Sequence, residues 1–392
     1  MAFTFDQIST ILNKIVGDVT GQNPAPGSYR TTKDFVAAAT TALSAGTDPI
    51  MHSISQMIGR TIFSIRPYDA ATNLIDQDAL TYGNAVRKIT PIFIDGAENQ
   101  PMYDDQPQDG QSTDHYIIKR PKALETRFTG FSQWEVQAPT IFEDQLRSAF
   151  TGPDQLGEFI SAQMTAVANE VNSQKEALAR NTIVNLMAAK MLRQSADVRH
   201  VLTEYNAATG QSIGTIAELY SPAYFESFVK WFVAYIEDIS DLMTRRSVKY
   251  HEPLTGYTIM RHTPKRDQRL LVYSFLLKAI KAMALSGIYN ESLLKMDVTA
   301  GVEFWQSMNA RMDFMADASY TAADGSIATG GVHGENIIGI LFDRDAMGMS
   351  ILDRRVLSTP LNESGLYRNI WVHGKQRVVF DNTEKVCLLL LD

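Results

Sequence analysis

The chain has 392 residues, enough for two or more ordinary domains, and 45% of them are hydrophobic, a normal share for a soluble globular protein. No apolar run reaches the roughly 18 residues of a membrane helix, and the amino-terminal MAFTFDQISTILNK lacks the basic start and cleavage site of a secretory signal. The net charge of −8 speaks against tight binding of nucleic acid by the whole surface, and the single cysteine, Cys387, excludes an internal disulfide and indicates a reducing compartment.

The first 60 residues predict an arm of short helices on flexible joints rather than a domain with its own core. Residues 4–21 are expected to form an amphipathic helix, because apolar residues recur along them at helical spacing. Five residues of this stripe are expected to dock the arm onto a protein: Ile8, Ile11, Leu12, Ile15 and Val19. A linker rich in Pro and Gly covers 22–30, and two more helices are expected at 34–45 and 50–58.

A long polar excursion follows a strand expected at 61–66. The segments 85–93 and 115–119 are predicted to be its two extended arms. The stretch between them has no lysine or arginine and carries six carboxylates: Asp95, Glu98, Asp104, Asp105, Asp109 and Asp114. The sign of the charge then changes at the base of the excursion, which carries four cations: Lys119, Arg120, Lys122 and Arg127. The EF-hand spacing is absent, and such an excursion is not stable alone, so we expect it to pack on another subunit.

The longest predicted element is an uninterrupted helix of roughly 40 residues, from about Asp154 to about Gln194. Apolar residues such as Leu156, Ile160 and Val167 follow the spacing of one helix face. A heptad repeat does not persist over the whole length, which disfavours a coiled-coil arm. We expect a structural strut whose apolar face lies on a sheet that includes strands from the carboxyl-terminal part of the chain.

The remaining segments predict a mixed region followed by a β-rich end, and the fold class is α+β. Expected elements are a strand with a glycine bend at 125–136, a turn at 193–211, helices at 222–245 and 264–284, and a strand at 301–305. Five short strands are expected near the end: 337–342, 349–352, 370–373, 378–380 and 386–391. A basic region in the middle is expected to contact protein, with nucleic acid as the alternative: Arg245, Arg246, Arg261, Lys265, Arg266 and Arg269.

The sequence predicts no catalytic residue, no cofactor and no metal site. The glycine-rich stretch 325–334 lacks both the Lys-Ser/Thr ending of a phosphate loop and the spacing of a dinucleotide turn, so an ordinary loop is expected there. The histidines are scattered, and one cysteine cannot build a zinc knuckle. Catalytic triads assemble from distant positions, so a missing motif does not exclude them.

The order of these parts resembles the major capsid protein of tailed double-stranded DNA phages, with the Hong Kong 97-type fold. The resemblance covers essentially the whole chain, and the local sequence is most similar to capsid proteins of small short-tailed phages. It rests on the order of elements and on four stretches: ALTYGNAVRKI, TRFTGFSQWEVQAPTIFEDQLRSAFTGPDQLGEFISAQM, RHTPKRDQRLLVYS and GILFDRDAMGMSILDRRVLSTPLNESGLYRNIWVHGKQRVVF.

The resemblance implies a division of the chain into five parts. Residues 1–60 would be the N-terminal arm, 61–81 an incoming strand and connection, and 82–128 an E-loop that reaches over a neighbouring subunit. Residues 129–200 and 346–392 would form the peripheral domain, with 154–194 as its spine helix, and 201–345 would form the axial domain around the capsomer axis.

The resemblance also implies a structural, non-enzymatic function. The chain would self-assemble through hexamers and pentamers into an icosahedral-type shell that encloses double-stranded DNA. The expected partners are further copies, a scaffolding protein, a portal protein and DNA in loose contact, with no membrane. The expected location is the virion capsid, and the host cytoplasm during assembly. Two alternatives stay open: a soluble α+β enzyme with an unrecognised site, and a non-viral compartment shell protein of the same fold.

Overall fold

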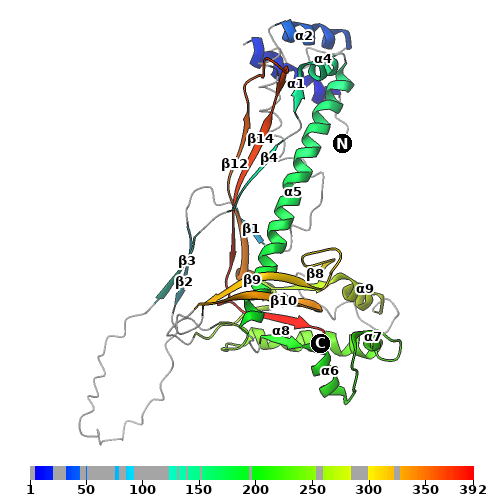
Figure 1. Ribbon diagram of the computed structural model, residues 1–392, viewed down its shortest axis with the longest axis vertical. Coiled ribbons are helices and arrows are strands. Elements are labelled where there is room, and N and C mark those ends of the chain that lie inside the picture. Colours follow the sequence, from blue (N-terminus) through cyan, green and yellow to red (C-terminus); the bar gives the residue numbers. More distant parts are fainter. Residues whose placement is uncertain are drawn as a thin grey trace, which may run out of the picture. The chain divides into compact units, whose positions relative to one another are not determined.

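The computed structural model describes residues 5–20, 32–44, 50, 76–78, 85–91, 123–129, 132–137, 140–150, 152–193, 197–252, 259–283, 299–321 and 327–392. The chain divides into two compact units, which we call unit 1 and unit 2. Unit 1 comprises Met1–Tyr82, Phe131–Asn181 and Gly348–Val378. Unit 2 comprises Gly83–Gly130, Thr182–Met347 and Val379–Asp392. Figure 1 labels the helices and strands of both units.

Unit 1 combines helices with a four-stranded sheet. Its helices are α1 (Phe5–Thr20), α2 (Thr32–Ser44), α4 (Glu143–Ala149) and the first part of α5 (Pro153–Leu192). The strands of the sheet, in spatial order, are β1 (Asp76–Asp78), β12 (Met347–Ser358), β14 (Ile370–Phe380) and β4 (Ser132–Gln137). A separate antiparallel pair is formed by β5 (Ile141–Phe142) and β13 (Tyr367–Arg368).

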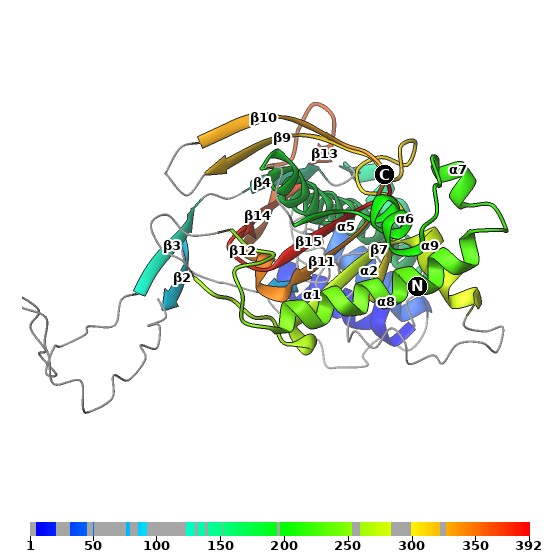
Figure 2. The same ribbon diagram turned by 90° about the horizontal axis from the view of Figure 1, so that it is seen from below.

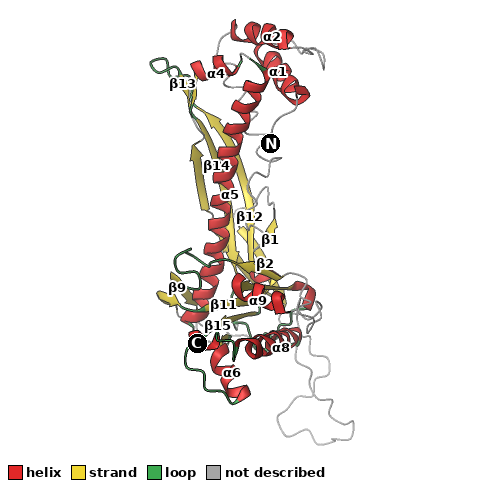
Figure 3. Cartoon of the chain, turned by 90° about the vertical axis from the view of Figure 1, so that its right-hand side faces the viewer, coloured by secondary structure: helices red, strands yellow, loops and turns green. Residues whose placement is uncertain are grey.

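The core of unit 1 lies between α5 and this sheet. Ile160 and Val167 of α5 are buried in one cluster with Val136 of β4 and Val372 of β14. Figure 3 shows α5 running alongside β12 and β14. The prediction that the long helix lies on a sheet with carboxyl-terminal strands is therefore confirmed, and so is its length, 40 residues.

The helices α1 and α2 contribute side chains to the core of unit 1. The sequence instead predicted an arm of short helices on flexible joints. Leu12 and Ile15 of α1 are fully buried in the same cluster as Phe35 and Ala42 of α2. The structure does not describe the side chains of Ile8, Ile11 and Val19. The strand expected at 61–66 and most of the helix expected at 50–58 also lie outside the described residues.

Unit 2 is built on a five-stranded sheet. Its strands, in spatial order, are β6 (Val198–His200), β15 (Val386–Leu390), β11 (Ile337–Asp343), β7 (Gln268–Tyr273) and β8 (Thr299–Val302). The central β11 is antiparallel to both β15 and β7, whereas the outer pairings, β15 with β6 and β7 with β8, are parallel. The helices of this unit are α6 (Val201–Thr209), α7 (Ile216–Leu219), α8 (Phe225–Thr244), α9 (Ser274–Met283) and the end of α5.

Two antiparallel hairpins complete unit 2. One pairs β9 (Phe314–Thr321) with β10 (Ile327–Gly334), and the other pairs β2 (Ala85–Pro91) with β3 (Ala123–Thr129). Two 3-10 turns, η2 (Lys265–Asp267) and η4 (Arg344–Ala346), precede β7 and β12.

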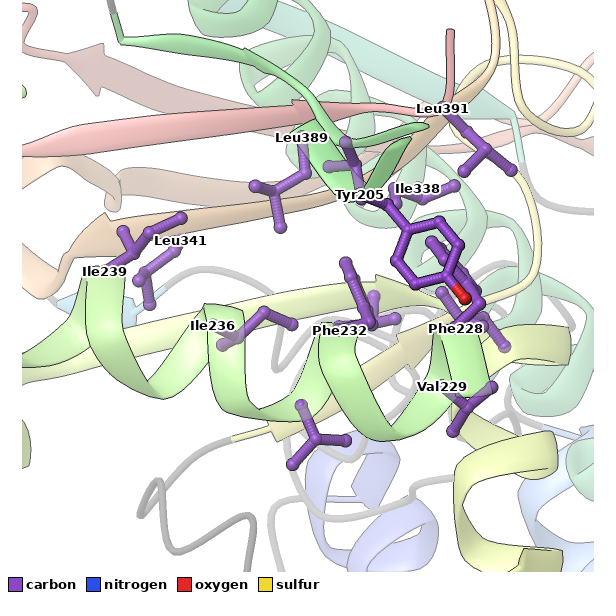
Figure 4. Close-up of a cluster of buried hydrophobic side chains, with 14 of the residues drawn as sticks. Tyr205, Phe228, Val229, Phe232, Ile236, Ile239, Ile338, Leu341, Leu389 and Leu391 are labelled. Atoms are coloured by element: carbon purple, nitrogen blue, oxygen red, sulfur yellow. The ribbon is translucent and has the colours of Figure 1, made fainter. Parts of the chain in front are cut away.

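The core of unit 2 forms where α8 packs on the five-stranded sheet (Figure 2). Phe232 and Ile236 of α8 point toward Leu341 of β11 and Leu389 of β15 (Figure 4). The helix expected at 222–245 is confirmed, and its aromatic residues serve packing, as the T-shaped contact of Tyr205 with Phe228 illustrates.

Three predicted elements are wrong because packing partners overrode the local pattern. The helix expected at 264–284 is divided into η2, β7 and α9, since Leu270–Val272 are buried between β11 and β8. The turn expected at 193–211 contains β6 and α6, and α6 ends at Gly210, whose φ of 72° favours glycine. The strand with a glycine bend at 125–136 is two strands in different sheets, β3 and β4.

The loop expected at 325–334 is wrong as well, because residues 327–334 form β10. A Cβ atom at Gly334 would lie 2.5 Å from Cε1 of Phe314, the facing residue in the hairpin. Glycine therefore serves close packing inside a strand here. The strands expected at 370–373 and 378–380 are likewise one strand, β14.

The segment 346–392, which the sequence placed in one domain, is divided between the units. Residues 348–378 belong to unit 1, whereas residues 346–347 and 379–392, with the last strand β15, belong to unit 2. The fully buried run of β15 pairs with β11 on one side and with β6 on the other.

Candidate functional site

The β2–β3 hairpin has two chemically different faces. Lys88 and Thr90 of β2 point to the face that is covered, where Thr90 is 6% exposed. Arg87 and Ile89 alternate with them and point outward, where Ile89 is 62% exposed. The arm expected at 85–93 is thus confirmed for 85–91, but its described partner is β3. The other expected arm, 115–119, lies outside the described residues.

Four charged side chains hold the covered face to its own unit, and we call them the hairpin anchor: Lys88, Arg261, Asp381 and Glu384. Nζ of Lys88 lies 2.5 Å from both Oδ2 of Asp381 and Oε1 of Glu384. Nη1 of Arg261 lies 2.6 Å from the same Glu384 oxygen, and its Nη2 donates to Thr90 Oγ1 at 3.3 Å. Two cations therefore meet two buried carboxylates, 4% and 7% exposed, from three distant segments.

The pKa values of the two anchor carboxylates are shifted in opposite directions from their ordinary values. Burial raises the pKa of Asp381, but the Lys88 ammonium and the donors of Thr383 lower it further, so the net pKa is below the ordinary value. Burial of Glu384 outweighs the attraction of Lys88 and Arg261, so the pKa of Glu384 is raised. Burial also raises the pKa of the nearby Asp343, which accepts a hydrogen bond from Thr263 at 2.6 Å. The anchor therefore combines strong attraction with a desolvation cost.

Lys385, next to the anchor, is a fully buried ammonium. Its Nζ donates to the carbonyl oxygen of Arg245 at 2.7 Å and to Oγ of Ser247 at 3.1 Å. Burial lowers the pKa of Lys385 from 10.5 to about 8.

Stability is expected to rise between pH 8 and 9 because of Lys385. In this range the unfolded chain keeps the lysine proton and the folded chain loses it, so the free energy of unfolding increases, by at most about 1.4 kcal/mol per pH unit. Urea midpoints at pH 7, 8 and 9 measure the effect, and Lys385→Met should show a flatter profile. Equal pH slopes for both proteins would contradict it. The buried thiol of Cys387, whose pKa is raised from 9.0 to about 12, has the opposite effect near pH 9, because the unfolded chain loses the thiol proton first. Both proteins share this effect, so the difference between their pH slopes still reports Lys385.

The outward face of the hairpin carries an arginine pair around one carboxylate. Arg87 binds Glu125 through Nε at 2.8 Å and Nη2 at 2.9 Å, and Nε of Arg127 reaches Oε1 of Glu125 at 2.5 Å. The hydrogen bond from Arg87, followed by that from Arg127, lowers the pKa of Glu125 to about 2. This face therefore presents one net positive charge beside the exposed Ile89.

The basic region expected to form a contact is divided by the structure. Arg261 belongs to the hairpin anchor, and Arg269 donates to the carbonyl oxygens of Arg266 and Gln268 at 3.0 and 3.1 Å. The other four residues lie on the surface: Arg245, Arg246, Lys265 and Arg266. Exposed apolar residues accompany them, namely Leu242, Val248 and Met260 at 40%, 53% and 37%.

The acidic tip of the excursion lies outside the described residues. This applies to all six of its carboxylates: Asp95, Glu98, Asp104, Asp105, Asp109 and Asp114. Of the base cations, Lys119, Arg120 and Lys122 also lie outside the described residues, and Arg127 is on the outward hairpin face. Sequence reasoning missed the hairpin anchor. The one local signal was that Arg87 and Lys88 are adjacent in the strand AVRKITP and therefore lie on opposite faces of β2, which indicates no partner for either.

The described residues include no group of three or more His, Cys, Asp or Glu placed to hold a metal ion. No helix in the described ranges is both long and apolar enough to cross a membrane.

Comparison with known families gives the identity. The sequence matches the family model described as Phi29-like phage major capsid protein over residues 12–390. The chain belongs to this family. A major capsid protein is a structural component of the virion shell, so the predicted function and its location in the virion capsid are confirmed. The enzyme alternative receives no support.

Two solved structures resemble this capsid protein at low identity. The capsid structure of Staphylococcus phage Andhra shares 10% identity and a TM-score of 0.51, covering 84% of this chain and 86% of that one. The structure of head fiber and inner core protein gp22 of native bacteriophage P68 shares 8% identity and a TM-score of 0.49, covering 82% and 84%. The first likeness confirms the predicted α+β capsid fold. No curated protein matches the sequence.

Proposed function

We propose that this chain assembles with copies of itself, as hexamers and pentamers, into a closed Hong Kong 97-type shell around double-stranded DNA. A scaffolding protein and a portal protein take part, assembly occurs in the host cytoplasm, and DNA contacts are loose and non-specific. The observation that carries the proposal is the anchored hairpin, which is held to its own unit on one face and exposes an apolar and basic surface on the other. A flat, interlocking shell needs many such surfaces rather than one deep pocket.

The two units suggest how the parts of the shell subunit are distributed. We propose that unit 1 is the peripheral domain with the first part of the spine helix, and that unit 2 includes the axial domain and the base of the E-loop. Residues 379–392 then join the axial side, because β15 completes the five-stranded sheet. Residues 1–60 remain the N-terminal arm, whose Leu12 and Ile15 dock on the core of unit 1.

Charge complementarity favours specific contact sites between copies. The acidic tip, residues 95–114, carries six carboxylates and no cation. The surface of unit 2 exposes four cations, Arg245, Arg246, Lys265 and Arg266, of which Lys265 pairs with Asp241 and Arg266 with Asp267. Complementary fields of this kind set the register between partners more than they set the affinity. We propose that both regions are contacts between subunits.

The proposal is tested by purifying the protein and examining it by negative-stain electron microscopy and light scattering, alone and with its scaffolding protein. Closed particles of uniform diameter are expected. A chain that stays monomeric at high concentration with the scaffolding protein present would contradict the proposal.

A further inference from the structure

The acceptor side of the hairpin anchor is the turn between β14 and β15, which has hydrogen bonds of its own. Asp381 accepts from the backbone N of Thr383 at 2.9 Å and from its Oγ1 at 2.7 Å. The N–H of Asp381 donates to the carbonyl oxygen of Ala346 at 2.8 Å. These contacts orient the Asp381 carboxylate and do not involve the hairpin, whereas the Glu384 carboxylate is held from outside the hairpin by Arg261.

Lys88 is the hairpin's only residue described as forming an ion pair with this turn. Its ammonium bridges two carboxylates that are themselves buried, and Arg261 supports the bridge through Glu384 and Thr90. Losing the ammonium would leave Asp381 with no described cation partner in a low-dielectric site, a costly arrangement. The geometry thus favours one docked orientation of the hairpin root.

We propose that Lys88 locks the β2–β3 hairpin onto the 381–384 turn of its own subunit before assembly, and that the lock presents the outward face to a second copy. The inference rests on the proposed function. It assigns a positioning role to Lys88 and a contact role to Arg87, Ile89 and Arg127. Alternation along one strand separates the two roles, because neighbouring residues of β2 point to opposite faces.

The occupant of the outward face is a second copy that offers carboxylates and apolar surface. The face carries a net positive charge around Glu125, with Arg87 and Arg127 exposed by 58% and 64%. The chain itself has 44 acidic against 36 basic residues, so another copy supplies the complementary charge. A surface fixed in advance also loses less conformational entropy when it binds.

Neighbouring residues of β2 provide matched variants for the test. The unassembled subunit, kept below the concentration at which particles form, is digested with subtilisin, and cleavage within the two strands, 85–91 and 123–129, is followed by mass spectrometry. Lys88→Met is expected to raise the cleavage rate at least about tenfold, because proteolysis follows the population of the open state. Lys88→Arg should restore protection, and Arg87→Met should cleave like the wild type. Circular dichroism checks that each variant is folded.

Particle formation separates the two roles. Lys88→Met should reduce particle yield, and Ile89→Asp should reduce it at least as much while leaving the cleavage rate at the wild-type value. Equal cleavage of the Lys88→Met and Arg87→Met variants would overturn the lock. Normal particles from Ile89→Asp would overturn the outward contact. A wild type that never forms particles would refute the proposed function instead, and the cleavage rates would still decide whether the lock exists.

Discussion

Replacing Asp104 and Asp105 with lysine is expected to prevent shell assembly while the subunit stays folded. Two negative charges become positive in a stretch that has no cation between residues 95 and 114. If this acidic tip lies on a basic surface of a neighbouring copy, the reversal replaces attraction with repulsion at every such contact in the shell. Particle yield by electron microscopy should fall below about a tenth of the wild type, with circular dichroism unchanged.

A neutral version controls for loss of the side chains themselves. Asp104→Asn with Asp105→Asn removes the charge without reversing it, so an intermediate yield is expected, and the effect should weaken at high salt. Normal particles from the lysine variant would exclude the acidic tip as an electrostatic contact.

Lys190→Ala is expected to give the largest loss of stability in unit 2. Lys190 is fully buried near the end of α5, 3.0 Å from Asp197 and 3.4 Å from Glu252. Removing one partner leaves buried carboxylates poorly compensated, which costs about 3 kcal/mol, the lower end of the usual range because Arg193 still pairs with Glu252. Hydrogen exchange of α8 in urea reports the free energy of opening in this unit.

Lys230→Ala is the matched control for this change. Lys230 pairs with Glu226 at 2.6 Å, but both side chains are exposed, by 41% and 57%. Exposed pairs of this kind contribute less than about 1 kcal/mol, so α8 should keep its protection. Similar losses in the two variants would show that the buried ion pairs of Lys190 do not stabilise unit 2.

The sequence predicted the elements whose own residues determine them. The 40-residue helix follows from an uninterrupted apolar stripe with no proline after its first residue, and α8 from aromatic residues at helical spacing. The β11 and β15 strands follow from short apolar runs bounded by turn residues. Each of these signals is local.

The failures concern elements that depend on distant partners. β7 is a strand because β11 and β8 flank it, although QRLLVYSFLLKAI also fits a helix. β10 has a glycine at 334 because the ring of Phe314, which faces it in the hairpin, occupies the space that a Cβ atom would need. Lys88 and Asp381 are 293 residues apart, so no spacing rule could have paired them. The hairpin anchor became visible only once the tertiary structure placed the β14–β15 turn beside β2.

Electron cryomicroscopy of the assembled particle would show directly where the β2–β3 hairpin lies in the shell. We expect a closed shell in which the outward face of each β2–β3 hairpin contacts a neighbouring copy, while Lys88 stays paired with Asp381 and Glu384 of its own chain. A shell in which that face meets only solvent, or in which Lys88 has left the 381–384 turn, would contradict it.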